Sequence, residues 1–169
     1  PTASNALFQM PNPFRWRQEM MRLDYNINPA HRLTARVMLD HYTLTAPYGT
    51  FIDGDLPTVP TDRNRPGWNL QMNHNWTISN SLLNEVKFNY SGNNQSIDPV
   101  GDTWARSTYG FQCPQIYPDG GTYEDSIPVG RISGFAGWNS ASSALISPTK
   151  DFAFSDTLTI LKGAHTVKT

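Results

Sequence analysis

The chain has 169 residues, 38% of them hydrophobic and only 16% charged, and its formal net charge at pH 7 is -1. Because the basic residues are scattered and the net charge is close to zero, the sequence offers no electrostatic surface for nucleic acid. The single cysteine, Cys113, excludes an internal disulfide bond and a thiolate metal cluster built from this chain alone, and we expect an inert loop thiol. Neutral polar residues, glycine and proline replace charged ones, which favours strands and turns and predicts an all-β chain.

Alternation of apolar and polar side chains, the signature of a strand with two different faces, recurs along the chain. In its first instance Met21, Leu23, Tyr25 and Ile27 alternate with polar neighbours. Similar segments follow, so the sequence predicts five complete strands and the start of a sixth. We expect the strands at about residues 16–27, 32–43, 67–78, 83–91 and 151–161, with the sixth starting at residues 165–169.

The connections between these strands alternate between short and long. Only a few residues join the first strand to the second, the third to the fourth and the fifth to the sixth, whereas residues 44–66 and 91–150 form long connections. In an antiparallel up-and-down meander, all the short turns then lie at one end of the sheet and the long loops at the other. These long loops hold most of the prolines and glycines, so we expect them to be irregular and to contain no strands.

Pairing register follows from the rule that facing residues share one face of the sheet. For the first hairpin the rule predicts a turn of three or five residues and not two. A three-residue turn of Pro29, Ala30 and His31 would place Asp24 opposite Arg36, an opposite-charge pair. The last hairpin instead fits a two-residue turn of Gly163 and Ala164, with glycine first, that brings Ile160 opposite Val167.

The third predicted strand, residues 67–78, shows the most regular alternation of apolar and polar residues. Its apolar side and its polar side would be stable in different environments. An outer-membrane barrel would provide lipid on one side and a wet lumen on the other, and about eleven tilted residues rise roughly 25 Å, the height of its apolar band. Trp68 and Trp76 lie on the apolar side at a separation suited to the two aromatic girdles. In that interpretation the lipid-facing residues are Trp68, Leu70, Met72, Trp76 and Ile78, and the lumen-facing residues are Asp24, Arg36, Asn69, Gln71, Asn73 and Asn75.

A soluble β-sandwich also alternates apolar and polar residues, so a secreted or periplasmic module that binds a glycan or a protein remains the alternative. Strand length favours the barrel, because sandwich strands average about 5 or 6 residues.

No catalytic or metal-binding pattern is present in the sequence, so we expect no enzyme activity, cofactor or metal; a hydrolase is a distant third possibility. The four histidines lack ligand spacing, and His74 on the apolar side is better explained as an interfacial or locally bonded residue. Asp53 and Asp55 flank a glycine, which fits a turn better than a calcium loop.

Aromatic residues of the second long loop are the candidates for substrate contact, since binding residues concentrate on loops. They equally suit packing of the loops against one another. The four residues are Trp104, Tyr109, Tyr117 and Trp138.

A series of short motifs, in order and at the right spacing over about two thirds of the chain, resembles TonB-dependent receptors of the outer membrane, in particular those with a carboxypeptidase-regulatory-like domain ahead of the plug. The series begins with an R-x-D-Y-N strand that turns into H-R-L-x-x-R, and continues with N-H-x-W-T-I-S before N-E-x-x-x-x-Y-S. It ends with F-S-D-x-L-T and a G-x-H-T-x-K turn. The matching residues are Arg22, Asp24, Tyr25, Asn26, His31, Arg32, Leu33, Arg36, Asn73, His74, Trp76, Thr77, Ile78, Ser79, Asn84, Glu85, Tyr90, Ser91, Phe154, Ser155, Asp156, Leu158, Thr159, Gly163, His165, Thr166 and Lys168.

This resemblance implies a segment of a 22-stranded barrel in the outer membrane of a Gram-negative bacterium. Such a receptor takes up a large nutrient, a siderophore, a glycan or similar, with energy passed by TonB to a plug domain in the lumen. Its partners would be outer-membrane lipid, the plug, TonB and an unknown nutrient. Neither a plug nor a TonB-contacting segment is evident in residues 1–169, so we expect an internal fragment of one barrel domain, with the two long loops outside the cell.

Overall fold

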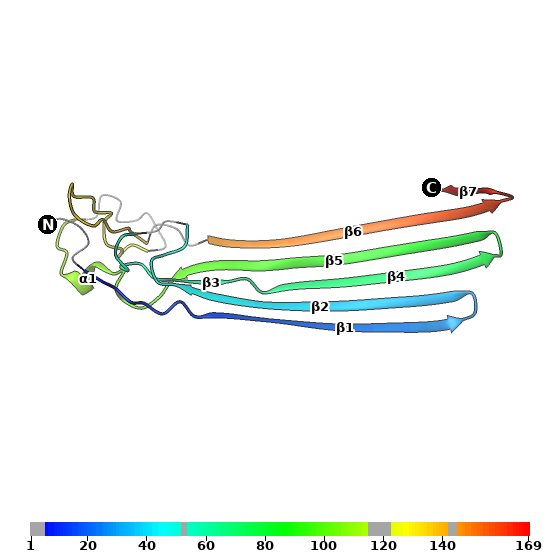
Figure 1. Ribbon diagram of the computed structural model, residues 1–169, viewed down its shortest axis with the longest axis horizontal. Helices are drawn as coiled ribbons and strands as arrows, with labels where there is room; N and C mark the ends of the chain where they lie inside the picture. Colours follow the sequence, from blue (N-terminus) through cyan, green and yellow to red (C-terminus); the bar gives the residue numbers. More distant parts are fainter. Residues whose placement is uncertain (1–5, 52–53, 115–122, 142–144) are drawn as a thin grey trace. The chain divides into compact units, whose positions relative to one another are not determined.

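The computed structural model describes residues 6–51, 54–114, 123–141 and 145–169, and it is an antiparallel all-β meander, which confirms the predicted fold class (Figure 1). The long strands form where apolar and polar side chains alternate, because alternation places most of the apolar side chains on one face. The long strands are β1 (Phe14–Asn28), β2 (His31–Ala46), β4 (Gly67–Ser79), β5 (Leu82–Pro99) and β6 (Leu145–Lys162); the short elements are β3 (Thr61–Asn64), α1 (Arg106–Tyr109) and β7 (His165–Lys168).

The chain divides into two compact units. The sheet unit comprises Arg17–His41, Pro66–Asn94 and Pro148–Thr169, and the loop unit comprises Pro1–Trp16, Tyr42–Arg65 and Gln95–Ser147. Four of the long strands contribute residues to both units, whereas β4 lies wholly in the sheet unit. No helix in the described ranges is long and apolar enough to cross a membrane.

In the sheet unit the strands follow chain order, β1, β2, β4, β5, β6 and β7, with neighbours joined by two-residue turns or by long connections (Figure 1). Strand β4 pairs with β2 on one side and with β5 on the other. The register brings residues of like polarity onto the same face. Met72 lies between Ala35 and Phe88, and Leu70 lies between Val37 and Tyr90; on the opposite face, Gln71 lies between Arg36 and Asn89, and Asn73 lies between Thr34 and Lys87.

The turns at the strand ends agree with one prediction and correct another. In the last hairpin Ile160 faces Val167 across Gly163 and Ala164, as predicted, and Gly163 has φ 59°, a conformation that a residue with a Cβ adopts at a cost. The first turn contains only Pro29 and Ala30, because His31 begins β2, so the predicted turn of three or five residues is wrong.

The Asn28 side chain explains the tighter first turn. Its Oδ1 accepts hydrogen bonds from the backbone N–H groups of Ala30 at 2.9 Å and His31 at 3.0 Å, so the side chain supplies part of the turn. The predicted charge pair is also wrong in its partner, because the Asp24 carboxylate accepts from Arg32 at 3.1 Å and from Thr34 at 2.8 Å, not from Arg36.

The long connections are not irregular throughout, which corrects the prediction that they contain no strands. Strand β3 lies inside residues 44–66, β5 continues to Pro99, and β6 begins at Leu145. Pro60 and Pro66 lie just outside β3, so the prolines delimit this strand and do not exclude one. Strand β3 pairs with the last residues of β2 and of β5, and its four residues T-D-R-N carry no apolar alternation that would reveal it in the sequence.

The loop unit has a small hydrophobic core of its own. Its members come from segments far apart in the chain, and all are less than one tenth exposed: Val59, Ile97, Ala105, Ile127 and Ala141. Burial of these side chains is what orders the long connections, because each contributes roughly 25 cal/mol per Å² of apolar area removed from water.

Candidate functional site

One face of the sheet unit is largely apolar. Met72 is 37% exposed and Trp76 is 40% exposed, and on β6 Phe152 and Phe154 are about 70% exposed, at 69% and 71%. The described strands form one sheet, and among them no second sheet covers this face. Such a surface favours contact with an apolar environment, because exposing apolar side chains to water costs free energy.

Aromatic residues link neighbouring strands on this apolar face. The Tyr90 ring stacks on Phe152 with centroids 4.6 Å apart and lies 6.4 Å from Trp68. Trp68 in turn lies over its facing residue Gly92, where an added Cβ would come within 2.5 Å of the indole and 2.4 Å of the Thr149 carbonyl oxygen. Glycine is therefore required at residue 92 to let the indole lie flat against the strand.

His74 is locally bonded. Its Nε2 lies 3.1 Å from Nδ1 of His31, a distance that fits a hydrogen bond between the two rings, and Trp76 stacks on His31 at 5.3 Å between centroids. No group of three or more potential metal ligands occurs in the part of the chain that the structure describes.

The opposite face carries hydrogen-bonded amides and ion pairs. Asn69 Nδ2 donates to Asn89 Oδ1 at 2.8 Å, and Asn73 Nδ2 donates to Glu85 Oε1 at 3.1 Å. The second oxygen of Glu85 pairs with Lys87 at 2.9 Å. The two amide contacts hold β4 and β5 together, and the groups involved also hydrogen-bond well to water.

Arginine side chains gather on the same polar face. Arg22 pairs with Asp24 at 2.7 Å, and Arg32 reaches the other oxygen of this carboxylate. Together with Arg36 these guanidinium groups line one open recess. The arginine trio was not identified in the sequence, although its signal was present: all three residues are on the polar parity of adjacent strands.

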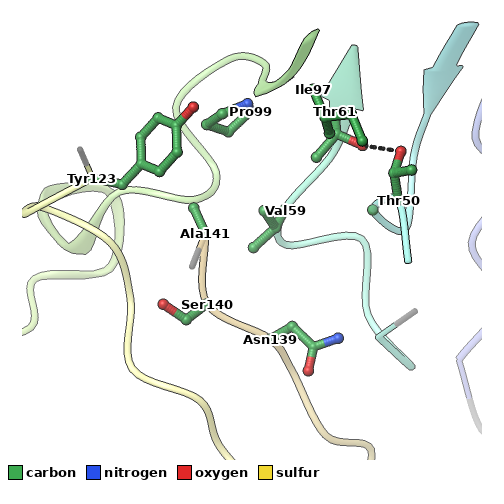
Figure 2. Close-up of a pocket in the computed structure, with 10 residues that line it drawn as sticks. Thr50, Val59, Thr61, Ile97, Pro99, Tyr123, Asn139, Ser140 and Ala141 are labelled. Atoms are coloured by element: carbon green, nitrogen blue, oxygen red, sulfur yellow. Dashed lines mark hydrogen bonds between the residues drawn. The ribbon is translucent and has the colours of Figure 1, made fainter. Parts of the chain in front are cut away.

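A pocket in the loop unit lies beside the small core, with Val59, Ile97 and Ala141 among the residues that line it (Figure 2). Thr50 and Thr61 share a hydrogen bond of 2.7 Å at one side of the pocket. Its volume is about 30 Å³, which admits about two water molecules and no nutrient. It is therefore a packing feature of the loop unit.

Tyr123 lines the same pocket and is tied to β5. Its hydroxyl donates to Asp98 Oδ1 at 3.3 Å. Burial, followed by the nearby Asp98 charge, raises the pKa of the Tyr123 hydroxyl above its ordinary value, because both disfavour the phenolate.

A model of the outer membrane beta barrel domain matches residues 1–169. The chain belongs to the outer membrane beta barrel domain family. No curated protein matches, and no solved structure matches. Membership places this barrel domain in the outer membrane of a Gram-negative bacterium, in a family that is typically non-enzymatic, and it overturns the alternative of a secreted or periplasmic β-sandwich.

The loop aromatics of the barrel domain differ in what they do. Trp104 donates from Nε1 to the Gly101 carbonyl at 2.8 Å and packs edge-on against Tyr123, while Trp138 donates to the Pro128 carbonyl at 2.8 Å. Both tryptophans hold loop segments together. Tyr109 is 48% exposed, and Tyr117 lies outside the described residues.

Three further residues were considered in the sequence analysis: Asp53, Asp55 and Cys113. Asp55 accepts a hydrogen bond from the backbone N–H of Gly137 at 2.7 Å and thereby joins the two long connections within the loop unit. Asp53 lies outside the described residues. Cys113 is exposed, and its sulfur accepts a hydrogen bond from Arg106 at 2.9 Å.

Proposed function

We propose that this barrel domain is part of a TonB-dependent receptor that imports a large nutrient, a siderophore, a glycan or a compound of similar size. The observation that carries the proposal is that residues of the receptor-like motifs contact one another across neighbouring strands. Asp24 of the first motif bonds to Arg32 of the second, and Asn84 Nδ2 donates to Asp156 Oδ1 at 2.6 Å, joining the motifs of β5 and β6. Such contacts give each motif residue a physical role in setting strand register.

The apolar face is proposed to contact outer-membrane lipid. Trp68, Leu70, Met72, Trp76 and Ile78 alternate along β4, whose 13 residues exceed the 9 to 11 that a tilted strand needs to cross the bilayer. The two tryptophans would lie at the two interfaces, where the indole N–H reaches water and the ring reaches lipid.

The polar face is proposed to line a water-filled lumen. Asn69, Gln71, Asn73 and Asn75 on β4, with Asp24 on β1 and Arg36 on β2, would be hydrated there and would avoid the cost of placing polar and charged groups in lipid. In a receptor this lumen holds the plug domain, through which TonB acts.

The loop unit is proposed to lie outside the cell and to meet the nutrient first. Of the loop aromatics, Tyr109 is the best candidate for nutrient contact, because Trp104 and Trp138 are held by hydrogen bonds to loop carbonyls. Its ring contacts Phe111 at 6.3 Å, which leaves a half-exposed aromatic pair for stacking on a ligand.

Binding to TonB tests the proposal directly. The intact protein, purified from outer membranes in detergent, is incubated with the immobilised periplasmic domain of TonB. We expect retention comparable to that of another TonB-dependent receptor from the same membrane, whereas a general porin from that membrane should wash through. Loss of the protein in the wash, while the known receptor is retained, would contradict the proposal.

A further inference from the structure

The recess on the polar face of the sheet unit is lined only by polar side chains, and three of them are arginines. Its volume is about 310 Å³, comparable to a site for a small molecule. The lining residues come from β1, β2 and β4: Arg22, Arg32, Thr34, Arg36, Gln71, Asn73 and Asn75.

The charges around this recess are not balanced within the described chain. Arg22 and Arg32 share one carboxylate, that of Asp24. Glu85, which faces Asn75 across the β4–β5 pairing, is already paired with Lys87 at 2.9 Å. The positive charges of three guanidinium groups are therefore balanced by the negative charge of only one carboxylate.

Arg36 carries the clearest sign of a missing partner. Its Nε atom is shielded from solvent, and it has no hydrogen-bond partner among the residues that the structure describes. A shielded guanidinium N–H without an acceptor is costly, and an anion in the recess would remove this cost.

The donor set indicates the chemistry of the occupant. Guanidinium groups present paired N–H donors that match the two oxygens of a carboxylate or phosphate, and the amides of Gln71 and Asn75 add further donors. Asn73 is not counted among these donors, because its Nδ2 already donates to Glu85 and its free Oδ1 is an acceptor. Because no apolar side chain lines the recess, it lacks the anchors through which polypeptide segments usually dock. A small anion with several oxygens fits these features better.

We propose that Arg22, Arg32 and Arg36 form a binding site for a small oxyanion with at least two negative charges, a polycarboxylate or a phosphate. Two charges are needed to balance the excess of guanidinium over carboxylate at the recess. This inference depends on the sheet unit alone, so it is independent of whether TonB energises the barrel.

Calorimetric titration tests the site, with the intact protein in a neutral detergent at low salt and with citrate and inorganic phosphate as separate probes. We expect one of the two probes to saturate a single site, and the one that binds identifies the anion as carboxylate or phosphate. Arg36→Gln should weaken that binding at least about tenfold, because a charge-assisted, two-pronged contact is lost. Arg36→Lys keeps the positive charge but loses the paired N–H donors of the guanidinium. Its affinity for the anion should therefore lie between those of the wild type and of Arg36→Gln.

Arg15→Gln is the matched control, because it removes the same charge from a β1 residue that does not line the recess. It should leave binding unchanged within about twofold. Heat-dependent gel migration of each variant shows whether the barrel is folded. Absence of binding by both probes, saturation by an acidic peptide alone, or equal effects of Arg36→Gln and Arg15→Gln in folded protein would overturn the proposal. TonB retention is unaffected by any of these outcomes, so the two proposals fail separately.

Discussion

Tyr123 links a buried phenol to a carboxylate on β5, and this contact makes the loop unit sensitive to alkaline pH. Because the pKa of Tyr123 is raised in the folded state, its contribution to stability is complete below the unfolded value near 10 and is lost as pH rises through the folded pKa. We therefore predict that the thermal unfolding of the loop unit, followed by near-ultraviolet circular dichroism, shifts to lower temperature as the pH rises above about 10.

Tyr123→Phe should weaken the loop unit at pH 7, by about 0.5 to 1.5 kcal/mol for the lost hydrogen bond, and should reduce its alkaline sensitivity. The matched control is Tyr109→Phe, since Tyr109 is exposed and its ring contact with Phe111 does not need the hydroxyl. Equal alkaline shifts in wild type and Tyr123→Phe would show that the phenol at residue 123 is not the titrating group that matters.

Single residues also mark how much of the candidate site could be read from the sequence. The polarity of Asn69, Gln71 and Asn73 was visible directly, since it depends only on alternation. The Asp24 partners were not, because the partner depends on the turn, and the Asn28 side chain tightens that turn through two hydrogen bonds. The core of the loop unit was invisible for another reason: residues such as Val59 and Ile127 are isolated in the sequence and meet only in the folded chain.

Substitutions on the two faces of a single strand can distinguish the two proposed environments, lipid and the water-filled lumen. Met72 and Asn69 lie on opposite faces of β4, and both are within its 13 residues. We predict that Met72→Arg costs about 2 to 4 kcal/mol of barrel stability, because it places a guanidinium in hydrocarbon. Asn69→Arg should cost about 1 kcal/mol, the loss of its hydrogen bond to Asn89.

Urea unfolding of the intact protein in lipid vesicles measures both costs. The comparison is internal, since the same charged group is added to the same strand on alternate faces. A larger cost for Asn69→Arg than for Met72→Arg would reverse the proposed assignment of lipid and lumen.

The same periodicity explains which strands could be predicted. Strands with sustained alternation, such as β4 and β6, were expected close to where they occur, and only their ends extend further. Strand β3 was missed because it consists of four polar or charged residues whose order comes from backbone pairing to β2 and β5. Pairing partners supplied by distant segments leave no local pattern.

For the molecule as a whole, the exposed apolar face means that the solvent determines whether the chain aggregates or stays dispersed. We predict that the 169-residue chain, expressed alone, aggregates in buffer, because residues such as Phe152 and Phe154 would meet water or one another. Transfer into detergent micelles should yield a dispersed species with strand-type circular dichroism. Size-exclusion chromatography with and without detergent distinguishes the two, and a stable monomer in plain buffer would contradict the lipid-facing assignment.

Among the described strands, β1 and β7 terminate the sheet and do not pair with each other. Their outward N–H and C=O groups would each cost several kcal/mol if left bare in hydrocarbon. Each of these two edges therefore needs a hydrogen-bonding partner before or during entry into the bilayer. Insertion into lipid is consequently coupled to the pairing of both sheet edges: strands with an unpaired edge would remain at an aqueous or chaperone surface that hydrogen-bonds the exposed backbone.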